Sequence, residues 1–347
     1  MARIFIDGFE SATWDLWDLN SYTHMNMNEY PPLWYAPSGF TSQFFVNSVG
    51  LSRAIAPMSE AYFAVKAGTT HTLKDPMISL DYNYELVSGY PRGAIFTLWI
   101  DSSIGVVHVG GGVDLDNFPE VGQGSPQWRA QSSTGLVNVG TVHLIEAYFK
   151  IDGSAGRCVV RLDGIEVINF TGNTLIGAYT TFNVVGLGPT NSATFMDDFI
   201  IDDFEFPGDT RIQAIYPNAV GNSSQWTPSI AADNYTLVDE IPPDVADYVS
   251  TNAINLTDTY SMSNLVGQIS SVVCVQPQVE IVKEGSPTPL NIDLVIRSAG
   301  TDYPSADKAV TTITPNGLFA LWQTNPAGGA WNETSVNSIE VGVKSKA

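Results

Sequence analysis

Hydrophobic and polar residues alternate along several segments in the first half of the chain. In residues 77–86, the apolar side chains Ile78, Leu80 and Tyr82 are separated by polar ones, which is the two-residue period of a strand with one buried face. Residues 93–101 are apolar on both faces and predict a central strand covered on both sides. Glycine and proline interrupt the sequence at short intervals, so the pattern indicates strands and turns rather than helices.

A hairpin and a strand of mixed character follow. Asp163-Gly164 stands between two β-rich runs within residues 156–170, and such a dipeptide is the strongest short-range signal of a hairpin turn. Residues 193–206 also alternate, but both faces of that strand would mix apolar side chains with aspartates. The pattern therefore predicts the strand without showing which face points inward. Further strands are predicted at residues 142–152 and 181–188.

The character of the sequence changes at residues 207–209, where a Pro-Gly-Asp sequence breaks the preceding strand. Beyond it, residues 241–252 are the best helix candidate, because Pro242 and Pro243 suit a helix start and Asp244 suits a cap. The strands predicted in this half are residues 211–217, 266–282, 290–300, 309–315, 317–326 and 335–344.

The spacing of these strands predicts the fold class. Strands that recur about every 8–12 residues, with turn residues between them, are typical of a β-sandwich or jelly roll. We therefore predict an all-β protein with a jelly-roll sandwich at residues 1–206 and a second, smaller β-sandwich at residues 207–347.

The net charge of the chain excludes some classes of binding partner. The 347 residues include 36 acidic and 15 basic ones, a net charge of -21 with histidine neutral, and such a field repels nucleic acid and anionic membranes. No run approaches the ~20 apolar residues of a membrane helix. Asp7 and Glu10 stand where a secretory signal would stay apolar, so we expect synthesis in a cytoplasm. Cys158 and Cys274 are too few and too far apart for a zinc site or disulfide framework.

No catalytic motif is evident. His24, His71, His108 and His143 are far apart and form no metal-binding or nucleophile-activating pattern. Jelly-roll glycosidases would need two carboxylates on one face of a strand, about 5 Å apart, and no Glu-x-Asp-x-x-Glu triplet occurs. We therefore predict that the protein is not an enzyme and has no cofactor, with a calcium ion as the alternative considered next.

Two acidic groups are candidates for calcium. Asp114 and Asp116 stand in a loop-like sequence, and calcium is held by several carboxylate and carbonyl oxygens. The acidic residues of 197–205 are a weaker candidate, because neighbouring residues of a strand point to opposite faces. A calcium site and a solvated acidic surface both remain open at this stage.

Aromatic residues are the remaining binding candidates. Tyr30, Trp34 and Tyr35 lie among prolines in residues 30–40, and aromatic faces on loops bind sugars by stacking or anchor protein partners. The same loop could equally be a lid over the core, and the sequence does not separate the two hypotheses.

Two stretches together resemble a known class of protein. The run VHLIEAYFKIDGSAGRCVVRLDGIEVINF followed by MDDFIIDD resembles the concanavalin A/laminin-G-like sandwich. The opening IFIDGFES and the phrases DNYTLVDE and WNETSVNSIEVGV resemble structural proteins of tailed bacteriophages, which pair such a sandwich with a second β-domain. The resemblance covers most of the chain and implies a virion component without enzymatic activity and without catalytic residues to carry over.

The resemblance leads to a functional prediction. We expect a non-enzymatic virion surface protein, on the tail or the capsid exterior, that contacts other virion proteins and itself, with a trimer as the expected oligomer. The expected role of this protein includes adhesion to a host glycan. The alternatives are a carbohydrate-binding module, with Trp34 stacking on sugar rings, and a glycan depolymerase.

The two predicted domains receive different roles. Residues 207–347 end in Lys344 and Lys346, a short basic tail suited to docking on an acidic virion surface. We assign attachment or oligomerisation to residues 207–347 and outward exposure to residues 1–206, with the reverse polarity as the alternative.

Overall fold

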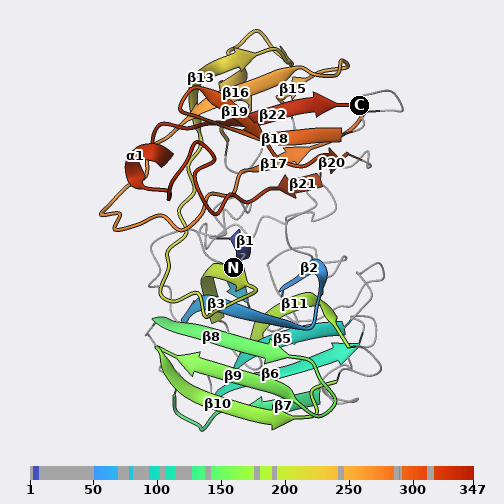
Figure 1. Cartoon of the computed structure of the whole chain (residues 1–347), viewed down its shortest axis with the longest axis vertical. Helices are drawn as coiled ribbons and strands as arrows, with labels where there is room; N and C mark the ends of the chain where they lie inside the picture. The colour runs from blue at the N-terminus through green and yellow to red at the C-terminus, as the bar shows by residue number, and fades with distance from the viewer. Residues whose placement is uncertain are drawn as a thin grey trace, which may run out of the picture. The chain divides into compact units, whose positions relative to one another are not determined.

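A computed structural model shows that nearly all of the described chain is strands joined by turns (Figure 1), which confirms the predicted all-β class. Within the described residues, helix is confined to the 3₁₀ turn η2 (Asn234–Leu237) and the short α1 (Glu333–Val336). None of these described helices is long enough to cross a membrane. The residues described are 3–7, 51–68, 78–80, 94–101, 106–113, 127–136, 142–175, 180–189, 194–240, 246–284, 289, 291–310 and 316–347.

The chain divides into two compact units, the first ending at Ile212 and the second running from Gln213 to Ala347. The sequence placed a boundary after residue 206, whereas residues 207–212 pack on the first unit through hydrogen bonds to its strands.

The described strands of the first unit form two sheets, which make the predicted jelly-roll sandwich (Figure 1). Sheet A has the order β1-β12-β3-β8-β9-β10, with β4 beside β12, and sheet B has the order β2-β11-β5-β6-β7. Sheet A consists of β1 (Arg3–Asp7), β3 (Glu60–Gly68), β4 (Ile78–Leu80), β8 (Val142–Lys150), β9 (Gly156–Leu162), β10 (Ile165–Gly172) and β12 (Thr194–Asp202). Sheet B consists of β2 (Leu51–Met58), β5 (Ala94–Asp101), β6 (Val106–Val113), β7 (Gln127–Gln131) and β11 (Phe182–Pro189). The position of β5 in the middle of sheet B confirms the central strand predicted at residues 93–101.

The predicted hairpin joins β9 to β10 at Asp163-Gly164. Both turn residues have positive φ, 51° and 80°, the left-handed conformation that a two-residue turn of this kind requires and that Asp and Gly accept. The Asp163 carboxylate also accepts from the backbone N–H of Leu144 (2.9 Å) and lies 2.7 Å from Nδ1 of His143. The turn is therefore tied to β8 as well as to its own strands.

The core of the sandwich is formed by alternate residues of the sheet A strands. In β8 these are Ile145, Ala147 and Phe149, each fully buried, and the two-residue period of the sequence predicted that alternation. Neighbouring strands contribute further buried side chains to the same face: Ala61, Phe63, Val65, Cys158, Val160 and Leu162.

Strand β12 is buried on both faces, which explains the mixed pattern of residues 193–206. Phe199 and Ile201 have no exposed surface, and Ile200 and Asp202 from the alternate positions are only 1% and 7% exposed. The register of β12 against β3 shifts between Asp197 and Ile200. A strand covered on both sides has no solvent face for its polar residues, so the sequence pattern could not show an inside and an outside.

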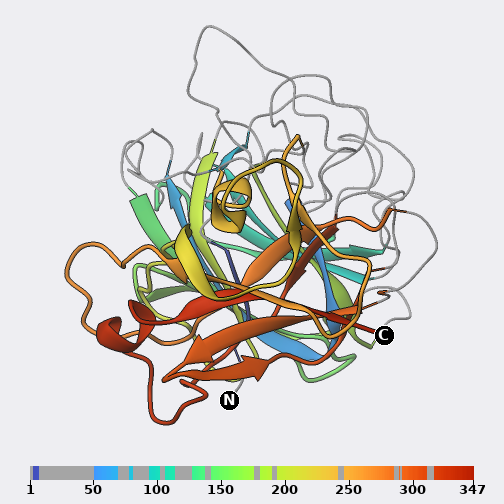
Figure 2. The same cartoon turned by 90° about the horizontal axis from the view of Figure 1, so that it is seen from above.

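The described strands of the second unit form one larger sheet, of order β13-β16-β22-β18-β19 with β20 beside β18, and two strand pairs, β14-β15 and β17-β21. The last strand of the chain, β22, lies between β16 and β18 (Figures 1 and 2; α1 is the short red helix). The strands are β13 (Pro217–Ser224), β14 (Thr227–Pro228), β15 (Val249–Ser250), β16 (Thr257–Met262), β17 (Gln278–Ile281), β18 (Asn291–Ser298), β19 (Thr301–Pro304), β20 (Lys308–Ala309), β21 (Asn316–Phe319) and β22 (Glu340–Lys346).

Several sequence predictions need correction in this unit. The described part of the predicted helix at 241–252 contains no helix, and its residues 249–250 form β15 against β14 instead. Only Gln278–Ile281 of the predicted strand at 266–282 is regular strand, because only those residues find a partner strand, β21. Residues 335–344 begin in α1 and become strand only at Glu340.

The predicted basic tail is part of the sheet. Lys344 and Lys346 lie in β22, and Nζ of Lys346 is 3.5 Å from the buried carboxylate of Asp293 and 3.7 Å from Asp307. Burial raises the pKa of Asp293, and a hydrogen bond with Asp307 acts in the same direction. The charge of Lys346 is therefore used within the unit and is not free for docking on a virion.

A buried carboxylate organises the other end of this sheet. Asp258 of β16 has no exposed surface. It accepts hydrogen bonds from the backbone N–H groups of Gln225 and Trp226, from the Asn234 side-chain amide (2.6 Å) and from the Tyr260 hydroxyl (2.9 Å). The donors from Gln225, Trp226 and Asn234 fix the chain that follows β13 and the turn η2 to the sheet.

Replacing Asp258 with Ala should lower the free energy of unfolding of the second unit by roughly 3–5 kcal/mol, because four donors, three of them in buried hydrogen bonds, lose their acceptor. The measurement is urea unfolding followed by tryptophan fluorescence. Asp302→Ala is the matched control, since Asp302 is 39% exposed and pairs only with Arg297 among the described residues; it should change stability by about 1 kcal/mol or less. Equal losses for the two variants would contradict the role of Asp258.

Candidate functional site

The site residues predicted from the sequence fall outside the described part of the chain. This applies to the aromatic residues Tyr30, Trp34 and Tyr35 and to the calcium candidates Asp114 and Asp116. They stay predictions.

Two acidic residues of β12, Asp198 and Asp202, have partners within the first unit. Asp198 pairs with Lys66 (2.9 Å) and accepts from the backbone N–H of Ile212 (2.6 Å). Asp202 accepts from the backbone N–H of Phe204 (2.9 Å) and so caps the turn after the strand. No cluster of three or more metal-ligating side chains occurs among the described residues.

The richest group of functional side chains lies on the outer face of sheet A. Tyr62 of β3 is directly paired with Tyr148 of β8, and Lys150 of β8 is paired with Arg157 of β9. Paired residues of neighbouring strands share a face of the sheet, and these alternate with the buried core residues of the same strands. We call this group the tyrosine face; its members are Glu60, Tyr62, Tyr148, Lys150, Arg157, Arg161 and Phe206.

Aromatic rings form the centre of the tyrosine face. The rings of Tyr62 and Tyr148 stack with centroids 4.5 Å apart and an angle of 30°. Phe206 meets Tyr62 edge-on, with centroids 5.1 Å apart and an angle of 80°. The guanidinium carbon of Arg161 lies 3.9 Å from the centroid of the Phe206 ring, a cation–π contact. Three rings and one guanidinium thus form a continuous platform whose members are all only partly buried.

A carboxylate and two phenols interact at one end of this platform. The Tyr148 hydroxyl donates to Oε2 of Glu60 over 2.6 Å. Burial, followed by that hydrogen bond and the charge of Glu60, raises the pKa of Tyr148 far above its usual value, and burial and Glu60 also raise the pKa of Tyr62. Both phenols therefore hold their protons at neutral pH and act as hydrogen-bond donors.

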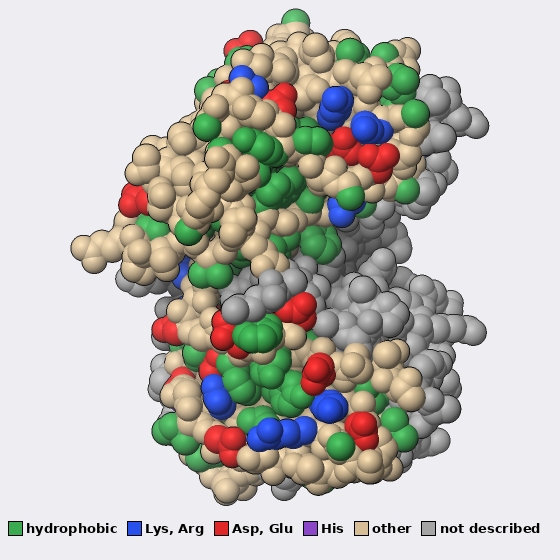
Figure 3. Space-filling view, in the orientation of Figure 1, with side chains coloured by type: hydrophobic (Ala, Val, Ile, Leu, Met, Phe, Trp, Pro, Cys, Tyr) green, Lys and Arg blue, Asp and Glu red, His purple; other side chains and the backbone are tan. Residues whose placement is uncertain are grey.

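Basic side chains border the rings. Lys150 of β8 is paired with Arg157 of β9, and Arg161 lies further along β9, where it is paired with Glu146. Figure 3 shows Lys and Arg side chains, together with Asp and Glu side chains, beside a hydrophobic strip on the unit that carries these strands. Within the described residues, no carboxylate forms an ion pair with Lys150 or Arg157. The face also carries two carboxylates, because Glu60 is paired with Lys150 and Glu146 with Arg161 in the sheet register. In a chain with only 15 basic residues and a net charge of -21, Lys150 and Arg157 are the cations of this face that can attract an anion.

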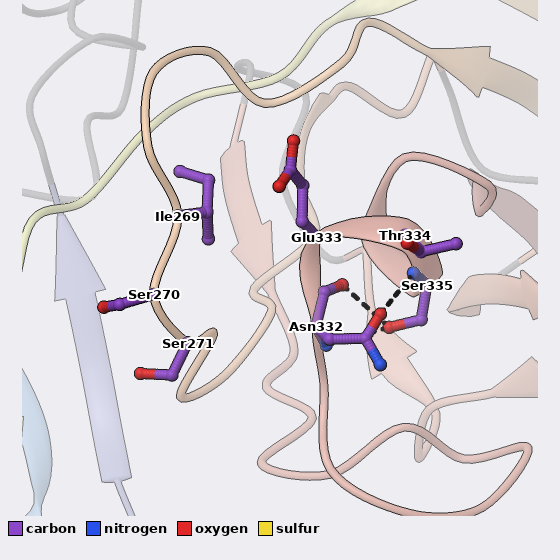
Figure 4. A pocket seen from close by; sticks show the side chains of 7 residues that line it. All are labelled: Ile269, Ser270, Ser271, Asn332, Glu333, Thr334 and Ser335. Carbon is purple, nitrogen blue, oxygen red and sulfur yellow. Dashed lines mark hydrogen bonds between the residues drawn. The ribbon is translucent and has the colours of Figure 1, made fainter.

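The second unit holds an open hollow, shown in Figure 4, with a volume of about 500 Å³. Its wall includes the start of α1, where the Asn332 side chain accepts from the backbone N–H of Ser335 and Oγ of Ser335 accepts from that of Asn332. These polar atoms already satisfy one another, and Glu333 is the one ionisable side chain of the lining. The hollow has neither the rings nor the cations of the tyrosine face and is the weaker candidate. Its lining is Ile269, Ser270, Ser271, Asn332, Glu333, Thr334 and Ser335.

Sequence reasoning missed the tyrosine face, although part of its signal was visible. Tyr148 and Lys150 occupy alternate positions of the predicted strand 142–152, and Arg157 and Arg161 occupy alternate positions of the next one. The period assigns each set to one face of its strand. Only the pairing of β3 with β8, which are far apart in sequence, brings Tyr62 and Glu60 to that face.

No protein-family model and no curated protein sequence matches this chain. Among solved structures, alginate lyase Aly36B is 12% identical, the match covering 55% of this chain and 96% of that one with a TM-score of 0.27. An endo-β-1,4-glucuronan lyase from the fungus Trichoderma reesei is 13% identical, covering 58% and 96%, with a TM-score of 0.27. A double mutant of Aly36B in complex with alginate tetrasaccharide is 15% identical, covering 45% and 74%, with a TM-score of 0.26.

These matches correct the functional prediction made from the sequence. The chain was expected to be a non-enzymatic virion surface protein, whereas the solved structures similar to it are polysaccharide lyases. We therefore withdraw the non-enzymatic role. At identities of 12–15% and TM-scores of 0.25–0.27, the matches assign neither a substrate nor a catalytic residue to this chain.

Proposed function

We propose that the first unit binds an acidic polysaccharide across the tyrosine face. The observation that carries the proposal is the Tyr62–Tyr148 stack bordered by Lys150 and Arg157, which the described residues leave without ion-pair partners. The carbohydrate-binding alternative raised by the sequence is kept, with residues of sheet A in the binding role in place of Tyr30, Trp34 and Tyr35.

The chemistry of the face suits a chain of sugar acids. Aromatic rings pack against the apolar faces of sugar rings while their hydroxyls bind at the edge. Guanidinium groups bind carboxylates with two parallel hydrogen bonds, and ammonium groups bind them as point charges. The Tyr148 hydroxyl donates its one proton to Glu60 and can accept from a sugar hydroxyl, while Tyr62 keeps a proton that it can donate to sugar hydroxyl or carboxylate oxygens. A neutral glycan would leave the cations without anionic partners.

Lys150 and Arg157 predict that the tyrosine face binds an acidic glycan more tightly than a neutral one. Lys150→Gln and Arg157→Gln should each weaken binding of polygalacturonate, a linear polyuronate, by about 2- to 5-fold, the range of an exposed ion pair. Neutral dextran should bind much more weakly than polygalacturonate, and added salt should weaken polygalacturonate binding. Isothermal titration calorimetry provides the dissociation constants.

Lys308→Gln removes the same charge from the second unit and is the matched control for Lys150→Gln. It should leave the affinity unchanged. Equal affinity for dextran and polygalacturonate, or equal losses for the two lysine variants, would contradict the proposal.

Cleavage of the bound glycan is a second candidate function, which the Tyr148–Glu60 hydrogen bond favours. Elimination from a uronate needs a base for the proton on the carbon beside the carboxylate. It also needs a cation at that carboxylate and an acid for the departing glycosidic oxygen. The carboxylate of Glu60, the guanidinium of Arg157 and the protonated phenol of Tyr148 are groups of these three types. As the bond from ring carbon to glycosidic oxygen breaks, a carbon–carbon double bond forms in the ring and the oxygen takes the phenol proton.

Tyr148→Phe separates binding from cleavage, because it keeps the ring and removes the proton donor. We expect the affinity for polygalacturonate to stay within about 2-fold, since one exposed hydrogen bond is lost. The release of unsaturated product should fall about 100-fold or more, the usual contribution of a general acid. The measurement is the ultraviolet absorbance of the unsaturated ends, with Tyr303→Phe in the second unit as control. Binding by the wild-type protein without any product would eliminate this second function.

The resemblance to tailed-bacteriophage proteins supports a separate proposal about location. A virion component made in the host cytoplasm would contact other virion proteins and further copies of itself, with a trimer as the proposed oligomer. Its glycan ligand would then be a bacterial surface polysaccharide.

Antibody labelling of purified particles, viewed by electron microscopy, tests the location. We expect label on the exterior of the particle, where the tyrosine face can meet a host glycan. Particles that lack the polypeptide, or that enclose it, would contradict the location without bearing on glycan binding.

A further inference from the structure

Residues 203–212, which we call the strap, follow β12 and run over the outer face of sheet A. The backbone N–H of Gly208 donates to Oε1 of Glu146 (2.9 Å), and the backbone N–H of Ile212 donates to Oδ1 of Asp198 (2.6 Å). Both carboxylates are only 4% exposed. A buried carboxylate needs donors to offset the loss of water, and the strap supplies them at two places.

A lysine ties the strap to the sheet a third time. Nζ of Lys66 lies 2.9 Å from the carboxylate of Asp198 in β12 and 3.0 Å from that of Asp209 in the strap. The Asp209 side chain is 76% exposed, whereas that of Lys66 is 20% exposed. The lysine therefore bridges the buried carboxylate beneath the strap and the exposed one on it.

Between these attachments and β12, the strap brings one ring to the tyrosine face. Phe206 contacts the ring of Tyr62 and lies under the guanidinium of Arg161. Phe204, two residues earlier, is 52% exposed, and no ring contact of Phe204 occurs among the described residues. The strap thus carries two phenylalanines of which one belongs to the site.

We propose that the strap is a positioning element of the tyrosine face: Phe206 holds Tyr62 and Arg161 in their binding orientations, and Lys66, Glu146 and Asp198 hold Phe206. This inference rests on the proposed glycan binding and adds two positioning residues to it, Phe206 and Lys66. A guanidinium already held against a ring loses less freedom when a carboxylate binds, and a supported tyrosine stack needs no rearrangement.

The test measures polygalacturonate binding to full-length variants by calorimetry. Phe206→Ala should weaken binding about 10-fold, because Arg161 loses its cation–π contact and must be ordered by the ligand. Phe206→Leu keeps apolar contact with Tyr62 and should give a smaller loss. Phe204→Ala, the matched control on the same strap, should bind like the wild-type protein.

A second pair of variants acts at a distance from the rings. Lys66→Met should loosen the strap, so that amide hydrogen exchange at Gly208 and Ile212 becomes faster and binding weakens by about 5-fold. Lys66→Arg keeps both ion pairs and should restore slow exchange and affinity together. A purely structural role would change exchange or thermal stability without changing affinity.

The outcomes separate this inference from the proposed function. If the wild-type protein binds no polygalacturonate, the proposed function itself fails. If the wild-type protein binds but Phe206→Ala binds equally well, or Phe204→Ala loses as much affinity, only the role of the strap is overturned. Faster exchange in Lys66→Met with wild-type affinity would overturn it too.

Discussion

Two carboxylates buried on the outer face of sheet A constrain the rest of the first unit. Glu146 and Asp198 are almost inaccessible to water, and a buried charge without donors costs several kcal/mol. The strap satisfies both with backbone N–H groups, and Lys66 of β3 pairs with Asp198 and with Asp209 of the strap. The face therefore cannot be an open, solvated sheet over its whole width. Part of it is closed by the strap, and what stays accessible is the tyrosine face.

The pairing of buried carboxylates also affects how charge is distributed over the protein, which the net charge of the sequence does not show. The net charge of -21 predicts repulsion of polyanions by the protein as a whole. Several described acidic side chains are nevertheless used internally: Asp198 beside Lys66, and Asp293 and Asp307 beside Lys346. Lys150 and Arg157 lie at the accessible end of the face. Local charge, and not the net value, decides whether an acidic glycan can approach over the last ~8–10 Å in physiological salt.

The second unit shows which of its strands a local sequence pattern can predict and which it cannot. The strand at 290–300 was predicted and is observed as β18, because its alternation is long and regular. The stretch 266–282 is as apolar in sequence but mostly irregular, since strands exist only where a partner strand supplies hydrogen bonds, and β21 reaches only Gln278–Ile281. Two prolines suggested a helix at 241–252, and residues 249–250 pair with β14 instead. Helix propensity is a weak prior that tertiary pairing overrides.

The sequence by itself determined the all-β class, the central position of β5 and the hairpin at Asp163-Gly164, because these follow from local period and from turn residues that tolerate positive φ. Only the tertiary structure decided that β12 is buried on both sides and that Tyr62 meets Tyr148. It also brought Phe206 under Arg161. These contacts join residues dozens of positions apart, and a period of two assigns a side chain to a face without saying which strand lies beside it. The pairing of β3 with β8 and the path of the strap are products of non-local packing, and no local pattern encodes them.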